Sequence, residues 1–394
     1  MTAIEPGDGG LGREPGGHGP DGTGARHARP ARQLRRRAGA GGLASLYGAV
    51  VVVTGASSGI GRAIAGEFAR NGAVIVLAAR REEALHEVAQ ACNAAGGHAV
   101  AVPTDVTRAE EMERLARSVA VRFGRIDLWV NNAGESLWGA FEDIPIATHT
   151  RLVQLNLLGV IHGSHAVLPY FLHQEHGTLI NVSSFAGQVP LPWAATYSAT
   201  KFGVRGLTES LRHELADRPG IRVCGVYPGF VDTPTFGNSA NYTGHELRPV
   251  PPVSDPAAVA RAVVSLARHP RRAADVGLAP KLAIPYALAP DLTGRLLSRL
   301  GGRFLRLGPS AADTDGILFA PAESSAAERG GWRARDRRGA GTALGIGLVA
   351  AGALALLIRS TLRGARPINR GQRAAALGER DDGPVQPAAE LADQ

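Results

Sequence analysis

The chain has 394 residues, a formal net charge of +8, 44% hydrophobic residues and only two cysteines. This length exceeds one domain of ordinary size, and two cysteines exclude a disulfide framework and favour a reducing compartment. The basic balance does not favour a nucleic-acid partner, because no helix-turn-helix, zinc or aromatic RNA-binding motif accompanies it.

Residues 1–42 are rich in Gly, Pro, Ala and Arg, with almost no large apolar side chains. Such a segment buries too little apolar surface to fold, so we predict a disordered basic arm. No apolar signal-peptide core adjoins its arginines, which argues against secretion. The arm would contact nucleic acid or anionic lipid, or it is a solvated tail or the product of a start codon assigned too far upstream.

A glycine-rich turn follows the first predicted strand, the β-branched run 49–54. At Gly55, Gly59 and Gly61 the missing side chains would let the backbone approach a pyrophosphate at the N-terminus of the next helix. An ordinary tight turn is the alternative. Because a strand precedes the glycines and a helix follows them, the segment predicts dinucleotide binding.

The next predicted strand, 73–79, ends at Arg80 and Arg81. NAD-binding units of this type have a carboxylate here for the ribose 2′-hydroxyl, whereas a guanidinium can hold a 2′-phosphate through two hydrogen bonds. We therefore favour NADP(H) over NAD(H), with Arg80 as the 2′-phosphate ligand. The alternative is that both arginines only open a solvated helix.

Beyond this point, short apolar runs alternate with amphipathic helical stretches. The remaining strands are predicted at 98–103, 126–131, 177–182, 221–226 and 273–278. The alternation predicts an α/β fold, a Rossmann-like doubly wound parallel sheet of about seven strands with helices on both faces, plus a C-terminal helical extension. The irregular stretch 233–252 follows the sixth strand and is placed to cover a substrate as a lid.

Tyr197 and Lys201 lie four residues apart on a predicted helix and therefore share one face. A nearby ammonium lowers a tyrosine pKa from about 10 toward neutrality, where a general acid or base works best. This spacing also occurs on many helices by chance. Together with the glycine turn, it predicts proton transfer in a dinucleotide-dependent reaction.

Six motifs occur in order along the chain: Thr54-Gly-x-x-x-Gly-x-Gly61, Asn131-Asn-Ala-Gly134, Asn156, Ser184, Tyr197-x-x-x-Lys201 and Pro228-Gly229. Together they resemble the single-domain branch of the short-chain dehydrogenase/reductase family, over about residues 46–280. The resemblance implies an oxidoreductase of EC class 1.1.1 that interconverts a carbonyl and a secondary alcohol. With Arg80 it is expected to depend on NADP, and the pocket residues named below favour a small-to-medium apolar substrate. The resemblance also implies a homodimer or homotetramer.

The resemblance implies a role for each motif residue. Tyr197 would pass the proton, Lys201 would lower the tyrosine pKa and bind the nicotinamide ribose, and Asn156 would hold a relay water. Ser184 would hydrogen-bond the substrate oxygen, with the adjacent Ser183 as the alternative. The implied cofactor-binding residues are Gly55, Ser57, Ser58, Gly59, Ile60, Gly61, Arg80, Asp105, Asn132, Ala133, Gly134, Tyr197, Lys201, Pro228, Gly229 and Thr233.

At the two ends of the cofactor, the resemblance implies Asp105 beside the adenine and Thr233 beside the carboxamide. For the substrate pocket we name Trp138 and Trp193 with Ser184, and the rings favour an apolar substrate although they equally fit ordinary packing. The other predicted pocket residues are Phe141, Val189, Pro190 and Leu191. The histidines form no HExxH or other ligand set, so no metal site is predicted.

Residues 339–358 carry no charged side chain, and this length is about what a helix needs to cross ~30 Å of hydrocarbon. We predict a membrane anchor, against the alternative of a soluble Ala/Gly-rich helix; arginines on both flanks leave its orientation open. Residues 281–338 are predicted as a helical, amphipathic extension and linker. Their 284–307 part would lie either on an anionic membrane surface or against the catalytic domain. Residues 359–394 are a predicted disordered polar tail.

These patterns predict an NADP(H)-dependent oxidoreductase with a cytoplasmic catalytic domain, tethered to a membrane if 339–358 inserts. A 3-oxoacyl-thioester reductase is the alternative reaction on the same scaffold. A non-catalytic NADP-sensing or scaffolding protein is the alternative class. The complete set Asn156, Ser184, Tyr197 and Lys201 argues against that class, because a sensor needs no proton relay.

Overall fold

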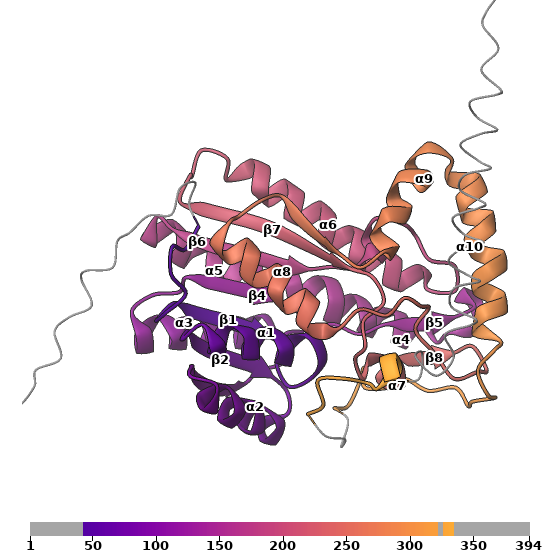
Figure 1. Ribbon diagram of the computed structural model, residues 1–394, viewed down its shortest axis with the longest axis horizontal. Helices are drawn as coiled ribbons and strands as arrows, with labels where there is room; N and C mark the ends of the chain where they lie inside the picture. The colour runs from indigo at the N-terminus through magenta and orange to yellow at the C-terminus, as the bar shows by residue number, and fades with distance from the viewer. Residues whose placement is uncertain (1–41, 322–325, 335–394) are drawn as a thin grey trace, which may run out of the picture. The chain divides into compact units, whose positions relative to one another are not determined.

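The structure is a computed structural model that describes residues 42–321 and 326–334. Strands and helices alternate along this part of the chain (Figure 1). The basic arm, the candidate membrane segment 339–358 and the polar tail 359–394 lie outside the described residues, apart from Gly42. Those assignments therefore stay predictions.

Seven parallel strands form the central sheet, in the order β3-β2-β1-β4-β6-β7-β9. The chain builds outward from β1 to β3 on one side and from β4 to β9 on the other, so the order reverses between β1 and β4. The strands are β1 (Val50–Thr54), β2 (Val74–Ala79), β3 (His98–Pro103), β4 (Leu128–Asn131), β6 (Gly177–Val182), β7 (Ile221–Pro228) and β9 (Ala273–Val276). This confirms the predicted Rossmann-like sheet. In open α/β sheets, ligands bind where the strand order reverses.

Helices cover both faces of the sheet because alternate strand residues point to opposite sides. Val51 and Val53 of β1 pack with α1, α2 and α8, whereas Val50 and Val52 belong to the core formed with α3 and α5. The helices are α1 (Gly59–Arg70), α2 (Glu82–Ala94), α3 (Ala109–Phe123), α4 (Ile146–Val153), α5 (Gly159–Gln174), α6 (Ala195–Glu214), α7 (Thr235–Asn238), α8 (Pro256–Arg268), α9 (Ala283–Leu288) and α10 (Pro290–Leu305).

A second, two-stranded sheet was not predicted. It pairs β5 (Leu137–Gly139) with β8 (Ala240–Tyr242) in parallel and thereby joins the loop after β4 to the loop after β7. Strands of three residues are too short to show a period-two pattern. Because β8 and α7 fall inside 233–252, the predicted irregular stretch contains regular structure.

One helical run in the described part, Ile146–Gln174, is long and apolar enough to span a membrane by length and composition. Half of its apolar window is buried inside the protein. The run comprises α4, the π-helical turn η3 (Gln154–Leu158) and α5, and Leu152, Val167 and Phe171 pack in the core beneath the sheet. Its apolar character is therefore accounted for by burial against the sheet.

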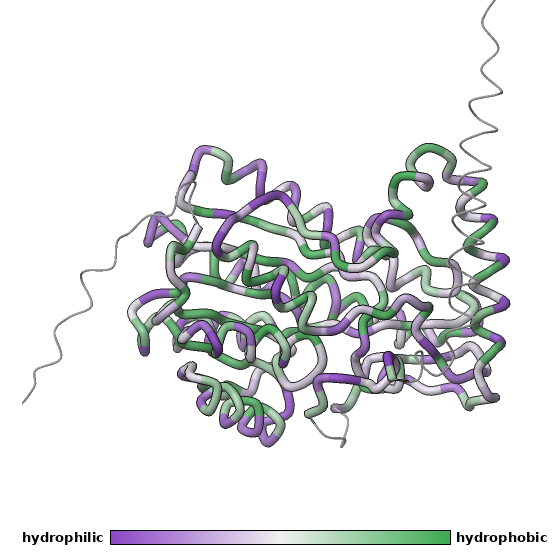
Figure 2. Tube along the Cα trace, in the orientation of Figure 1, coloured by the Kyte–Doolittle hydropathy of each residue, from purple (hydrophilic) through white to green (hydrophobic). Residues whose placement is uncertain are grey.

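The C-terminal extension contains α9, which has no charged residue, and α10, along which apolar and charged residues alternate (Figure 2). Part of α10 packs on the rest of the protein, since a Cβ at the buried Gly302 would lie 3.5 Å from the Trp193 indole nitrogen. Ile284 and Leu288 of α9 are 68% and 80% exposed. The contact of Gly302 with Trp193 favours the alternative in which 284–307 lies against the catalytic domain. Because Ile284 and Leu288 are exposed, a role of this segment at a membrane surface stays a prediction.

Candidate active site

The turn between β1 and α1 requires glycine for its conformation and for its close contacts. Gly55 and Gly59 have φ values of +65° and +53°, which residues with a side chain rarely adopt. At Gly61, a Cβ would lie only 2.1 Å from the Gly55 carbonyl oxygen. The glycines therefore let the turn pack closely against the start of α1, where backbone N–H groups would bind a pyrophosphate.

A second loop, after β4, is held against this turn by Thr54. The Thr54 hydroxyl accepts hydrogen bonds from the backbone N–H groups of Asn132 at 2.9 Å and Ala133 at 3.1 Å. The Asn132 side chain donates in return to the Thr54 carbonyl at 3.0 Å. Since β1 and β4 are neighbours, these bonds place the predicted residues Asn132–Gly134 beside the glycine turn, at the reversal of strand order.

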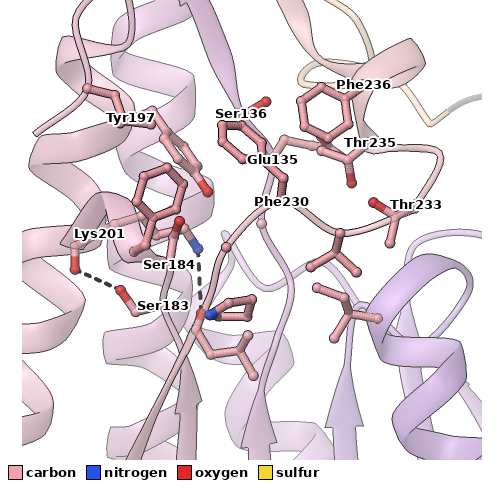
Figure 3. Close-up of a pocket in the computed structure, with 18 of the residues that line it drawn as sticks. Glu135, Ser136, Ser183, Ser184, Tyr197, Lys201, Phe230, Thr233, Thr235 and Phe236 are labelled. Carbon is pink, nitrogen blue, oxygen red and sulfur yellow. Dashed lines mark hydrogen bonds between the residues drawn. The ribbon is translucent and has the colours of Figure 1, made fainter. Parts of the chain in front are cut away.

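Of the four predicted catalytic residues, Ser184, Tyr197 and Lys201 line one cavity, and Asn156 is not among its lining residues (Figure 3). Tyr197 and Lys201 lie on α6, with the Lys201 ammonium 5.7 Å from the centre of the Tyr197 ring. Lys201 Nζ donates to the Val182 carbonyl at the end of β6, 3.5 Å away. Ser184 follows the same strand, and Ser184, Tyr197 and Lys201 all line the cavity. The expected arrangement on one helix face is therefore present.

The adjacent residues Ser183 and Ser184 form different hydrogen bonds. The Ser183 hydroxyl donates to the Lys201 backbone carbonyl at 2.9 Å, one of the dashed bonds in Figure 3. The Ser184 hydroxyl accepts from the Ala186 N–H at 3.1 Å and also interacts with the Tyr197 phenol, which lowers the pKa of that phenol. Ser184 is therefore the serine directed at the tyrosine, and Ser183 fixes the backbone of α6.

Asn156 lies in the π-helical turn η3 between α4 and α5 and is fully buried. Its side-chain oxygen accepts from the Glu135 N–H at 2.9 Å. Its amide nitrogen donates to the Glu135 carbonyl at 2.8 Å and to the Thr200 hydroxyl at 3.2 Å. π-helical turns are frequent at functional sites, and this one connects the loop after β4 to α6.

Burial dominates the electrostatics of the pair on α6. Burial raises the pKa of Tyr197 to about 12, although its hydrogen bond with Ser184 lowers it. Burial also lowers the pKa of Lys201 to about 8. The sequence predicted a tyrosine pKa lowered by the lysine, whereas in the structure the pKa is raised, because burial disfavours the phenolate and the charge of Glu135 adds to this effect. Tyr197 is thus a protonated phenol at neutral pH.

Glu135 was missed by the sequence analysis. It lines the cavity, and its Oε2 atom is buried without a hydrogen-bond partner in the described residues. Burial raises the pKa of its carboxyl to about 8, against the lowering effect of a hydrogen bond from the Ser136 N–H and the charges of Arg80 and Lys201. Its position directly after the Asn131–Gly134 motif could have indicated in the sequence that this acidic residue lies at the site.

Aromatic side chains form the apolar part of the cavity. Trp138, Phe185, Phe230 and Phe236 line it, and the Phe185 and Phe230 rings are 5.3 Å apart. Of the predicted pocket residues, Trp138 and Leu191 line this cavity, whereas Trp193, Phe141, Val189 and Pro190 are not among its lining residues. Trp193 instead faces Gly302 of α10, and Phe141 packs on the His149 ring at 4.7 Å.

The predicted residues for the adenine end gather after β2 and β3. Arg80 directly follows β2 and donates to two backbone carbonyls, those of Ile317 at 2.8 Å and Leu318 at 3.5 Å. Asp105 accepts from the Thr107 N–H and hydroxyl at 2.9 and 2.8 Å. Burial would raise the pKa of Asp105, but these hydrogen bonds and the charge of Arg151 hold it below its usual range.

The remaining predicted cofactor residues lie on the same edge. Ser57 and Ser58 belong to the glycine turn, with Ser58 as the N-cap residue of α1, and Ile60, Pro228 and Gly229 line the cavity. Thr233 faces the turn, since a Cβ at Gly59 would lie 3.4 Å from its side chain. Within the described ranges, no group of three or more His, Cys, Asp or Glu side chains is arranged to hold a metal ion.

Comparison with known proteins identifies the class. The family of short chain dehydrogenases matches residues 49–242. An uncharacterized oxidoreductase, YxnA of Bacillus subtilis, is 36% identical over 265 residues, covering 66% of this chain and 74% of that protein. An uncharacterized oxidoreductase of Staphylococcus epidermidis is 42% identical over 185 residues, covering 47% of this chain and 79% of that protein. The chain belongs to the short-chain dehydrogenase/reductase family and is an oxidoreductase of that family.

Two solved structures share the fold. A tryptophan variant of actinorhodin polyketide ketoreductase with NADPH has 33% sequence identity and a TM-score of 0.56, covering 60% of this chain and 99% of its own. A short-chain type dehydrogenase/reductase from Mycobacterium marinum has 26% sequence identity and a TM-score of 0.54, covering 60% of this chain and 96% of its own.

Proposed function

We propose that this protein is an NADP(H)-dependent oxidoreductase of EC class 1.1.1 that interconverts a carbonyl and a secondary alcohol. The observation that carries the proposal is the convergence of Ser184, Tyr197 and Lys201 on a cavity that Ile60 and Gly134 also line. The cavity thus connects proton-transfer groups to the glycine turn and the loop after β4.

The residues present fit a nicotinamide dinucleotide, which would supply or accept the hydride when bound. The glycine turn carries no side chains at Gly59 and Gly61, so a pyrophosphate would bind to backbone N–H groups at the start of α1. Arg80 at the end of β2 favours a 2′-phosphate. The similarity to a ketoreductase solved with NADPH supports the same preference.

Tyr197 performs the proton transfer in this proposal. Because the pKa of its phenol is about 12, the group is protonated at neutral pH and can donate to a carbonyl oxygen during reduction. Ser184 donates a second hydrogen bond to that oxygen. Since negative charge develops there, the two donors stabilise the transition state more than the ground state. In the oxidative direction, the Lys201 ammonium beside the ring stabilises the phenolate.

The aromatic lining of Trp138, Phe185, Phe230 and Phe236 favours a small-to-medium apolar substrate. Reduction of a 3-oxoacyl thioester is the second candidate, supported by the similarity to a polyketide ketoreductase. A purely NADP-sensing role is disfavoured, because a sensor has no use for the hydroxyl pair of Ser184 and Tyr197.

The remaining proposals concern the whole chain. Residues 46–280 would be the catalytic domain, assembled as a homodimer or homotetramer in the cytoplasm. Residues 339–358 would tether it to a membrane if they insert. Fractionation of the full chain between membrane and soluble pools tests the tether, and light scattering in detergent tests the assembly.

The function is tested by NADPH consumption, with NADH in parallel, against aldehydes, ketones, quinones, steroids and 3-oxoacyl thioesters. We expect turnover that Tyr197→Phe lowers by about 10²- to 10⁴-fold while NADPH affinity is unchanged. Tyr170→Phe on α5 is the matched control, since Tyr170 is partly buried against the core and does not line the cavity. Equal turnover in wild type and Tyr197→Phe would contradict the proton-transfer role.

A further inference from the structure

The chain after α10 returns to the edge of the sheet where the proposed cofactor site lies. We call residues 314–321 and 326–333 the C-terminal strap; its later part is drawn in orange and yellow near α7 and β8 in Figure 1. The strap is anchored in the protein interior. Leu318 is fully buried in the core with α3 and α5, and Ala326 is 2% exposed in the core with α1 and α8.

The strap binds two groups that we assign to cofactor phosphates. The Arg80 guanidinium, proposed for the 2′-phosphate, donates to the carbonyls of Ile317 and Leu318. The Gly59 N–H at the first position of α1, proposed for the pyrophosphate, donates to the Ala327 carbonyl at 3.0 Å. In both cases a carbonyl oxygen with partial negative charge takes the hydrogen bond that a phosphate oxygen would accept.

The first anchor of the strap surrounds Asp315. Its Oδ1 accepts from the Thr148 hydroxyl at 2.6 Å and the Tyr242 hydroxyl at 2.7 Å. Thr314 exchanges two backbone hydrogen bonds with Asn241 of β8, at 2.8 and 3.0 Å. These contacts fix the strap immediately before the carbonyls that bind Arg80.

The second anchor lies after β7, beside the residue proposed for the carboxamide. The Trp332 N–H donates to the Asp232 carboxylate at 2.8 Å, and Asp232 directly precedes Thr233. Arg329 forms an ion pair with Asp255 at 3.2 Å, and Arg333 pairs with the same carboxylate. The strap therefore contacts the proposed site at the 2′-phosphate end, at the pyrophosphate turn and next to Thr233.

We propose that the C-terminal strap is an internal competitor for the phosphate groups of the cofactor. This inference rests on the proposed function. When the strap is seated, its carbonyls occupy the Gly59 and Arg80 donors, and a dinucleotide gains these donors only when the strap withdraws from them. The fraction of molecules with a seated strap then reduces the apparent affinity for the cofactor.

If the C-terminal strap competes with the cofactor phosphates, we expect two results with full-length protein. Hydrogen exchange at the Ile317 and Trp332 amides, which donate to the Asn238 carbonyl and the Asp232 carboxylate, should become faster when NADPH binds. The double variant Arg329→Ala/Arg333→Ala, which removes the ion pairs to Asp255, should bind NADPH about three- to tenfold more tightly. Asp315→Ala should do the same by releasing the first anchor.

NADH and a distant variant provide the controls. NADH lacks the 2′-phosphate and competes only at Gly59, so its affinity should increase less than that of NADPH in Asp315→Ala, which frees Arg80, and about as much as that of NADPH in Arg329→Ala/Arg333→Ala, which frees Gly59. Arg70→Ala removes an exposed ion pair with Glu67 at the other end of α1 and should leave the Kd unchanged.

Three results would overturn the inference. NADPH could slow exchange in the strap while the loosened variants bind it more weakly, in which case the strap covers a bound cofactor. NADPH could bind wild type and all variants with one Kd, in which case the strap is only structural. If neither NADPH nor NADH binds any of these proteins, the proposed function fails together with the inference.

Discussion

Gly61 and Gly66 lie on the same helix, α1, but differ in the space available for a side chain. A Cβ at Gly61 would lie 2.1 Å from the Gly55 carbonyl oxygen, whereas at Gly66 the nearest atom is the end of the Arg70 side chain at 3.7 Å. Alanine brings a similar gain in helix propensity at both positions, up to about 1 kcal/mol. The two variants should therefore differ mainly by the cost of the clash, about 1–3 kcal/mol.

We expect Gly66→Ala to be slightly more stable than wild type and Gly61→Ala to be less stable. With a urea m-value of about 3 kcal/mol/M, their unfolding midpoints should differ by about 0.3–1 M. NADPH should bind Gly66→Ala with the wild-type Kd and Gly61→Ala about tenfold or more weakly, because the displaced turn no longer matches a pyrophosphate. Equal midpoints and equal Kd values for the two variants would refute the assignment of this turn.

Three further changes test other parts of the chain. Arg80→Ala should weaken NADPH binding far more than NADH binding, and an equal loss in a fluorescence titration would remove its 2′-phosphate role. The carboxyl of Glu135 has its pKa raised from 4.5 to about 8, so wild-type stability should fall as the pH rises between these values, because the folded state holds the proton more tightly. In Glu135→Gln this fall should be missing from urea midpoints measured at pH 5 and pH 8; an unchanged fall would show that other groups cause it. Deleting 339–394 should move the protein from the membrane pellet to the supernatant, and a full chain already in the supernatant would reject the anchor.

The order of strands and helices could be predicted from local pattern, because burial leaves a short-range signal. The strand predicted at 98–103 has these bounds in the structure, and the one predicted at 273–278 ends at Val276. The β5–β8 pair could not be predicted, since each strand has three residues and the pairing joins segments about one hundred positions apart. Its existence depends on where the two loops lie after the main sheet has formed.

The sequence by itself determined the chemistry of the site: the glycines that permit the turn, the Tyr197 and Lys201 spacing, and the serine after β6. These depend on residue type and on helical or strand geometry, which act over a few positions. The tertiary structure decided which serine faces Tyr197, that Trp193 packs against α10 instead of lining the cavity, and that the Oε2 atom of Glu135 is buried. It also decided the direction of the Tyr197 pKa shift and the contacts of the C-terminal strap with Arg80 and Gly59. Desolvation and contacts between distant segments arise only when the chain has folded.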